Sequence, residues 1–300
     1  MKVTDSKGNP IDMDKARGAV KMLASTDPVT RDKAFAAVQT PIRRKVEKES
    51  SARRIYETAY LSDQEDAIFP LDTEDEVEVV LASAYGIPPI SMFMTGVVTI
   101  NTDTYQGGWE LPEQLAKAGR IDQVRRNSRR MAEGFISKEE ATAWSAITAS
   151  ASEANTVEVE GTGAGSASIE LINEMLIYFQ DRGYVPTQCW MSPRSMGDIR
   201  MLCKEAGFAD QVRFDLWKNG MLPGLWNIDF YAMRGLPDDK LYMFDTSRFG
   251  IMAIRQDIET REDPAARAQF KIRVYGQAQY GWAVTQKDAL CVGSFTRGGS

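Results

Sequence analysis

A stretch of 62 residues, 55–116, contains no lysine or arginine, and this gap constrains the fold more than any other feature of the sequence. The same stretch holds twelve Asp or Glu, whereas residues 1–54 hold thirteen Lys or Arg against seven Asp or Glu. Residues 117–300 are neutral overall and include a group of arginines between positions 120 and 130. Because opposite charges attract, such segments are suited to contacts between subunits. Ordinary solvated faces are an alternative explanation of the same pattern.

The composition disfavours several classes of chemistry. The chain has no histidine, which removes the most common metal ligand and the most common general base near neutral pH. Its three cysteines, Cys189, Cys203 and Cys291, are far apart and are expected to be small buried hydrophobic residues. We therefore expect no catalytic residue, no cofactor and no metal site.

A glycine-rich stretch, Gly161 to Gly165, is the only enzyme-like motif. A phosphate-binding loop needs a Gly-Lys-Ser/Thr sequence, and no lysine follows here. The glycine spacing also differs from that of a dinucleotide-binding fingerprint. We interpret the stretch as a flexible connection, and an enzyme stays an alternative that rests on this motif alone.

No apolar run approaches the roughly 18 residues that a membrane-spanning helix needs. Residues 1–10 are polar and lack the apolar core of a signal peptide. The sequence therefore predicts a soluble protein in the cytoplasm of the cell that makes it, without a membrane partner.

The N-terminal part predicts a helical arm. Asp27 and Pro28 are typical of a helix start, and a helical pattern runs from Val29 to about Leu61. Pro41 is expected to kink or divide that helix. Its second half, Ile42 to Tyr60, is so highly charged that we expect an arm lying on another surface, outside its own subunit.

Two strand-like runs follow, separated by an apolar segment. The first run spans Val77 to Leu81 and the second Val97 to Asn101. Between them, Tyr85 to Met94 is apolar, contains two prolines and shows no helical period. An apolar loop needs a covering surface, and an isolated two-stranded excursion is marginally stable, so both features favour docking onto a neighbour.

The second half of the chain predicts helices followed by strands. A helix over residues 120–133 is expected to bend at Gly134 and to restart at Ser137, and two further helices flank a strand from Tyr184 to Met191. The predicted C-terminal strands are Trp226–Met233, Lys240–Asp245, Gly250–Gln256, Phe270–Tyr275 and Ala289–Phe295.

This order of elements resembles the major capsid proteins of tailed phages, which have the α+β fold named after phage Hong Kong 97. The C-terminal run carries the resemblance best, from Pro223 through Leu241-Tyr-Met-Phe-Asp245 and Phe249-Gly-Ile-Met-Ala-Ile-Arg255 to Asp288-Ala-Leu-Cys-Val292. The resemblance implies five parts. They are an N-terminal arm (1–71), an extended β-loop (72–116), a spine helix with peripheral domain (117–165), an axial domain (166–225) and a β-rich peripheral and axial part (226–300).

The resemblance also implies a function. Copies would form hexamers and pentamers of an icosahedral head shell around double-stranded DNA, with weak non-specific DNA contacts. A portal and a cement or scaffolding protein would be further partners. The location would be the virion, after assembly in the host cytoplasm. A cellular encapsulin shell of the same fold is the alternative, and a DNA-binding module resting on basic residues such as Arg43 and Arg53 is another.

Charge segregation within this family frame leads to an interface hypothesis. Four acids of the extended loop are expected to pair with spine-helix arginines of a neighbour: Glu74, Asp75, Glu76 and Glu78 with Arg125 or Arg129. Some family members cross-link through a loop lysine, and residues 55–116 contain none. We therefore expect a shell that holds together without covalent cross-links.

Overall fold

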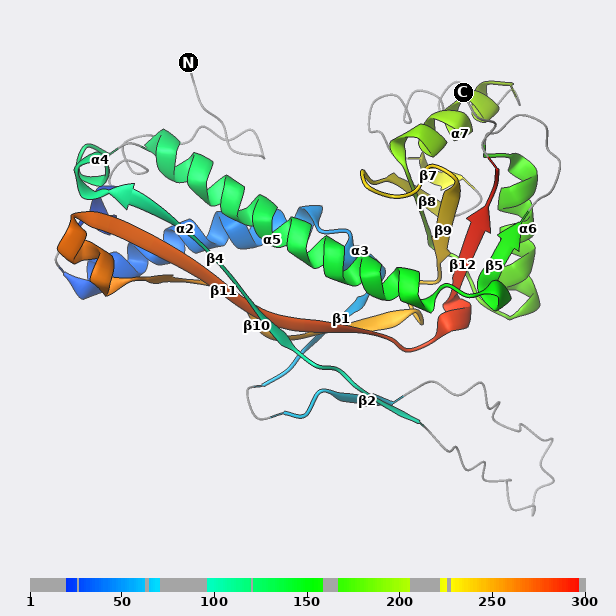
Figure 1. Cartoon of the computed structure of the whole chain (residues 1–300), viewed down its shortest axis with the longest axis horizontal. Coiled ribbons are helices and arrows are strands. Elements are labelled where there is room, and N and C mark those ends of the chain that lie inside the picture. Colours follow the sequence, from blue (N-terminus) through cyan, green and yellow to red (C-terminus); the bar gives the residue numbers. More distant parts are fainter. Residues whose placement is uncertain are drawn as a thin grey trace, which may run out of the picture.

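The computed structural model of the chain describes residues 20–25, 27–62, 65–70, 96–119, 121–158, 167–205, 222–225 and 228–296. They form an elongated body, made of two long helices on a long sheet, that ends in a compact second domain (Figure 1). The acids at 74–78, the apolar stretch 85–94 and the glycine-rich stretch 161–165 lie outside the described residues.

The N-terminal arm begins with helix α2, Pro28–Glu49. Asp27 caps it by accepting a hydrogen bond from the Thr30 amide at 3.0 Å, and Pro28 occupies the first turn, as the sequence predicted. The helix continues through Pro41, so the expected division does not occur. Packing of α2 against both α5 and the long sheet compensates for the backbone hydrogen bond that proline cannot make. The short helix α3, Ala52–Ile55, and strand β1, Glu57–Tyr60, follow.

The body contains a four-stranded sheet in the order β1-β10-β11-β4. Strands β10, Gly250–Glu262, and β11, Lys271–Val284, form a long antiparallel hairpin, and each is much longer than predicted. Strand β4, Asp103–Pro112, pairs antiparallel with β11 along its whole length. The segment expected to be an extended loop up to residue 116 therefore returns to the body earlier, at β4.

A much smaller sheet marks the base of the excursion. Strands β2, Ile68–Pro70, and β3, Val97–Thr99, pair antiparallel with each other and with no other described strand. Figure 1 shows β2 on a projection that leaves the elongated body. The second predicted strand, Val97 to Asn101, is found as β3, whereas the first, Val77 to Leu81, lies outside the described residues and β2 was not predicted.

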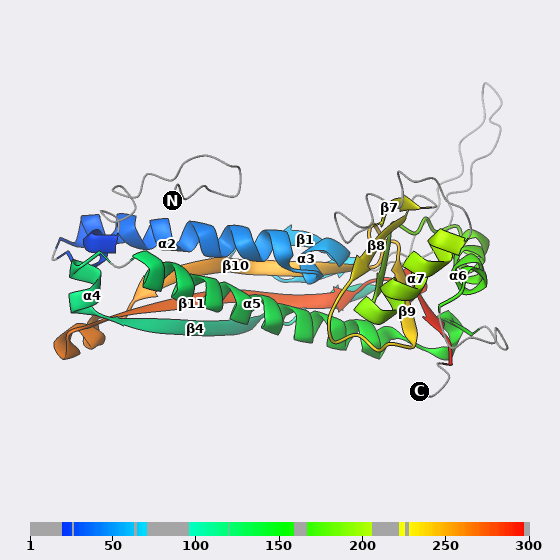
Figure 2. The same cartoon turned by 90° about the horizontal axis from the view of Figure 1, so that it is seen from above.

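The spine helix α5, Ile121–Ser150, follows the short helix α4, Glu113–Lys117. It is continuous, so the predicted break between Gly134 and Ser137 is wrong. Its buried stripe runs without interruption from Val124 to Ile147. A Cβ atom at Gly134 would meet nothing within 4 Å, which shows that this glycine lies on the open side. Seen from above, α2 and α5 run along the sheet (Figure 2), with α2 over β10 and α5 over β4 and β11.

The compact domain is a six-stranded sheet in the order β5-β12-β9-β6-β8-β7. Helices α6, Ile169–Asp181, and α7, Pro193–Glu205, pack on it, close to the helices that the sequence predicted. The strands are β5 Thr156–Glu158, β6 Gln188–Met191, β7 Leu222–Leu225, β8 Ile228–Ala232, β9 Lys240–Phe244 and β12 Leu290–Ser294. Short 3-10 helices in the described residues cover Glu153–Asn155, Lys287–Ala289 and, between β10 and β11 of the body, Pro264–Gln269.

Trp144 joins the two domains. From the last third of α5 its ring packs edge-on against Trp190, Tyr242 and Phe244 of the six-stranded sheet, with centroid distances of 6.2, 5.4 and 6.2 Å. Its indole N–H donates to the Ser51 hydroxyl at 3.2 Å. One hydrophobic core therefore extends from the arm through the spine helix into the compact domain.

Candidate functional site

The most distinctive group of polar side chains lies where the arm meets the spine helix and strand β10. The Arg53 guanidinium, on α3, contacts the Glu139 carboxylate on α5, with Nη2–Oε1 at 2.8 Å and Nε–Oε1 at 3.1 Å. Arg53 is 5% exposed and Glu139 is fully buried. Buried charges of this kind are tolerated only when they are paired and hydrogen-bonded, so the contact fixes the arm at this point.

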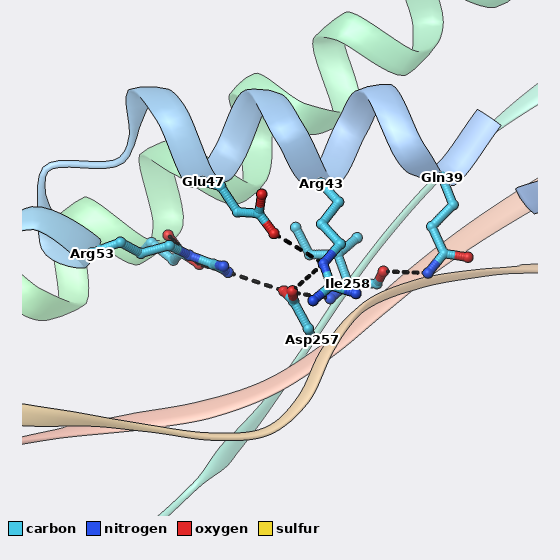
Figure 3. Close-up of polar contacts among 7 residues, drawn as sticks. Gln39, Arg43, Glu47, Arg53, Asp257 and Ile258 are labelled. Carbon is cyan, nitrogen blue, oxygen red and sulfur yellow. Dashed lines mark hydrogen bonds and ion pairs between the residues drawn. The ribbon is translucent and has the colours of Figure 1, made fainter. Parts of the chain in front are cut away.

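Asp257 on β10 completes the group. Its Oδ1 lies 3.2 Å from Arg53 Nη2 and its Oδ2 lies 2.5 Å from Arg43 Nε on α2. The Arg43 N–H is directed at Glu47 Oε1, 3.0 Å away, so the contact between Arg43 and Asp257 is an ion pair without hydrogen-bond alignment. Two arginines from the arm therefore converge on one strand carboxylate (Figure 3).

A local irregularity of β10 places Asp257. The register with β11 shifts between Ile254 and Gln256 and again between Gln256 and Glu259, which marks bulges in β10. The Asp257 carboxylate accepts from the Ile258 amide at 2.8 Å, and the Gln39 side chain donates to the Ile258 carbonyl at 2.9 Å (Figure 3). The arm thus satisfies backbone and side-chain groups that the bulge turns toward it.

Further contacts extend this attachment in both directions. At the start of α2, Arg31 Nη1 lies 3.1 Å from Glu262 Oε2 on β10. On the spine side, Lys45 Nζ lies 2.8 Å from Glu133 Oε1, and the Ser51 amide donates to Glu140 at 3.4 Å. We call the set Arg43, Arg53, Glu139 and Asp257 the arm clamp.

The clamp overturns one expectation from the sequence. The charged half of the arm, Ile42 to Tyr60, was expected to lie outside its own subunit, but Ile42, Val46 and Ile55 are buried against that subunit. Arg43, Lys45 and Arg53 of this half have ion-pair partners on α5 and β10. The clamp residues were missed as a site because each partner is remote in sequence. The apolar spacing Phe35, Val38, Ile42 and Val46 was the available signal for intramolecular packing.

The electrostatics fit a structural role. Burial alone would lower the pKa of the Arg53 guanidinium, but the hydrogen bonds and charges of Glu139 and Asp257 outweigh it and raise that pKa. Burial raises the pKa of the Glu140 carboxyl, and the charge of Glu139 adds to this effect. Arg53 therefore stays charged at any pH at which the protein folds.

The structure does not bring the predicted interface residues together. Arg125 and Arg129 are exposed on α5, beside a cavity between α5 and α2. Arg129 Nε lies 2.8 Å from Glu133 Oε1, one helical turn away. Their expected partners, Glu74, Asp75, Glu76 and Glu78, lie outside the described residues, so this pairing stays a prediction.

The other side chains considered for chemistry are inert where they are described. Cys189 and Cys291 are buried, as predicted, and the side chain of Cys203 is outside the described set. Burial raises the pKa of the Cys291 thiol to about 12 and also raises that of Cys189, so neither forms a thiolate near neutral pH. The described residues contain no group of three or more Cys, Asp or Glu suited to a metal ion. In the same residues, no helix has the length and hydropathy needed to cross a membrane.

Comparison with known families decides the assignment. The family model described as "Phage capsid protein" matches residues 96–292, about two thirds of the chain. The chain belongs to the phage capsid protein family. Its function is therefore that of a major capsid shell protein, a structural component of the virion, and the resemblance seen in the sequence is confirmed. No curated protein shows a significant sequence match.

Solved shell proteins share the fold of this capsid protein. The capsid of Mycobacterium phage Cain superposes with a TM-score of 0.56 at 13% identity, over 84% of this chain and 91% of that one. A virus-like particle from Pyrococcus furiosus gives 0.55 at 12%, over 86% and 98%. The SrpI encapsulin of Synechococcus elongatus gives 0.52 at 12%, over 80% and 85%. The predicted Hong Kong 97-type α+β fold is thus confirmed, and the family match favours a phage capsid over the encapsulin alternative.

Proposed function

We propose that this capsid protein assembles, without a catalytic step, into hexamers and pentamers of the icosahedral head of a tailed double-stranded DNA phage. The observation that supports this most directly is the contrast between a clamped body and a projecting excursion. The arm clamp and the Trp144 junction make the body one rigid unit. The β2–β3 base carries the chain away from that unit (Figure 1), and we place a neighbouring subunit on that side.

The surface of the excursion base supports a docking role. Ile68 and Val97 are 50% and 65% exposed, and Tyr60 on the adjacent β1 is also exposed. A two-stranded sheet is marginally stable on its own, and exposed apolar side chains on it favour a covering partner. We assign that cover to the body of the next subunit in a capsomer.

The charges of the excursion and of the spine helix indicate which surfaces of two neighbouring subunits meet. The acids Glu74, Asp75, Glu76 and Glu78 follow β2 in the chain and contact Arg125 and Arg129 on the spine helix of the neighbour. Arg125 is the stronger candidate of the two arginines, because it forms no ion pair within the described residues while Arg129 pairs with Glu133. Complementary charges of this kind select partners and register.

Charge reversal tests this contact. The double variant Glu76→Lys, Glu78→Lys is expected to raise the protein concentration at which particles form by at least about tenfold, because like charges then face each other. Combining it with Arg125→Glu, Arg129→Glu should restore assembly. Normal assembly of the first variant would contradict the pairing, and the matched control Glu57→Lys, Glu65→Lys places the same charges on exposed acids outside residues 74–78.

The proposed shell is held by non-covalent contacts, because the excursion offers no lysine for a cross-link. A denaturing gel of assembled particles should show one band at the monomer mass, and a ladder of covalent oligomers would contradict this. A cement protein is then the expected source of additional strength, and a separate scaffolding protein and a portal complete the assembly in the host cytoplasm.

Packaged DNA is the proposed cargo, held by weak salt-dependent contacts with basic residues on the inner surface. Nucleic acid inside purified particles supports the phage head. A packaged enzyme in its place would instead support the encapsulin alternative.

A further inference from the structure

The tip of the β10–β11 hairpin carries an aromatic side chain that the subunit leaves uncovered. Phe270 is 76% exposed, more than any other large hydrophobic residue described. Its φ of 57° lies in the left-handed region, and no other non-glycine residue of the described chain has a positive φ. That conformation is unfavourable for a residue with a side chain, so an exposed aromatic residue held in it calls for a functional explanation.

The backbone around Phe270 is firmly held. Its carbonyl accepts a hydrogen bond from the Glu113 amide at 2.9 Å, which ties the tip to the start of α4. The next residue, Lys271, forms an ion pair with Glu110 at 3.0 Å, and Ala266 is buried on the preceding turn. The ring is therefore presented from a rigid support, as an anchor of an interface should be.

A matching cavity lies elsewhere on the same molecule. It occupies about 520 Å³ between α2 and the first turns of α5, and no aromatic side chain of the described residues lines it. Its wall is apolar, and Arg125 and Arg129 stand at its rim with Lys45. Guanidinium groups bind aromatic faces, so the rim suits an entering phenyl ring. The principal apolar lining residues are Leu23, Val38, Ile42, Val124 and Ala132.

We propose that Phe270 of one copy of this protein inserts into the α2–α5 cavity of a second copy. The inference rests on the proposed function, because it needs copies that meet in a shell. A second copy is the fitting partner, since one chain carries both an apolar anchor and an apolar, cation-rimmed cavity at separate places. A contact between different patches is head-to-tail, so it can link one subunit to the next around a ring or between rings.

A disulfide-trapping experiment tests the contact between copies. One preparation carries Phe270→Cys and a second, of different mass, carries Ala37→Cys, which lies on the cavity wall. Mixed, assembled and oxidised, they should give at least about tenfold more covalent heterodimer than a control, because a disulfide forms only when the two Cα atoms come within about 7 Å. The control replaces Phe270→Cys by Val185→Cys, the next most exposed large hydrophobic position after Phe270, on the compact domain.

The outcomes separate this contact from assembly itself. Closed particles without excess heterodimer, or Phe270→Cys chains linked to one another, would overturn the contact and leave the proposed function standing. Heterodimer in a preparation that forms no particles would support the contact and count against the shell. A third outcome compares chains with and without residues 1–19. If only the chain that lacks them forms the heterodimer, those residues occupy the cavity, and the proposal is overturned.

A pair of substitutions distinguishes a binding role from a folding role. Phe270→Gly removes the ring and relieves the left-handed backbone, so the subunit should unfold at the same or a higher temperature while assembly needs at least about tenfold more protein. Ala37→Phe, which fills the cavity from within, should weaken assembly in the same way. Unchanged assembly of both variants would overturn the proposal, and Val29→Ala, at an exposed site outside the cavity wall, serves as the matched control.

Discussion

Arg53 and Glu139 form a two-pronged buried ion pair, 2.8 and 3.1 Å between their nearest atoms, that attaches the N-terminal arm to the spine helix. Asp257 adds the long sheet to the same contact at 3.2 Å. Three segments far apart in the sequence thereby become one body. A shell subunit needs a body of this kind, because forces applied at its interfaces would otherwise detach the N-terminal arm from the spine helix and the sheet.

Loss of the buried pair should be costly. Glu139→Gln is expected to lower the free energy of unfolding by about 3–5 kcal/mol, because it leaves Arg53 buried with a single carboxylate that Arg43 also contacts. Denaturant unfolding of the unassembled subunit measures the change. The matched control is Glu133→Gln on the same helix, whose solvent-screened ion pairs should contribute far less to stability. Equal small effects of both variants would show that the clamp is not structural.

Glu140 gives the subunit a pH dependence of known sign. Its folded pKa is raised above the ordinary value of 4.5, chiefly by burial, so the folded state holds the proton more tightly than the unfolded state. Stability contributed by this group therefore falls as the pH rises from 4.5 through the folded pKa, and it is level above that point. Glu140→Gln keeps an acceptor for the Ser51 amide and should remove this slope and raise stability at pH 7. An unchanged slope in denaturant midpoints measured across this window would contradict the assignment.

Gly281 on β11 tests how closely the connection between β3 and β4 packs on the long sheet. A Cβ atom there would lie 2.2 Å from the backbone oxygen of Asn101, which connects β3 to β4. Gly281→Ala should therefore displace that connection and cost about 1–3 kcal/mol. Gly134→Ala, on the open side of α5, should instead stabilise by up to about 1 kcal/mol, because alanine favours a helix. Thermal unfolding of the two variants should move in opposite directions, and a shift in the same direction would refute this packing.

Trp144 tests the connection between the two domains. Trp144→Ala removes three aromatic contacts and the donor to Ser51, and should cost about 3–5 kcal/mol. Trp144→Phe keeps most of the apolar contact and loses the hydrogen bond, so it should cost clearly less. Two separate unfolding transitions in the alanine variant would show that the junction makes the domains cooperative, whereas an unchanged single transition would contradict it.

The sequence predicted what depends on local pattern. The spine helix was expected to start near residue 120 and is found at Ile121–Ser150, because Val124, Met131, Phe135 and Ile147 repeat at helical spacing. The predicted break was wrong because burial of the continuous stripe from Val124 to Ile147 outweighs the low helix propensity of Gly134. The family resemblance, which depended on the order and spacing of the C-terminal strands, identified the fold correctly.

The arm clamp could not be predicted, because it depends on distant partners. Arg53 lies 86 residues from Glu139 and 204 from Asp257, and the bulges that aim Asp257 leave no clear pattern in β10. A charge-rich helix with few apolar residues therefore resembled a free arm. The net charge of the arm did not indicate that an arginine such as Arg53 would be buried within the subunit.

Copies of this chain are expected to close into a shell. Electron microscopy of the purified full-length protein tests it most directly, with mass per particle measured on the same sample. We predict closed particles of uniform diameter whose mass is a large multiple of the 33.4 kDa chain. A stable monomer at every protein concentration and ionic strength tested would contradict the account.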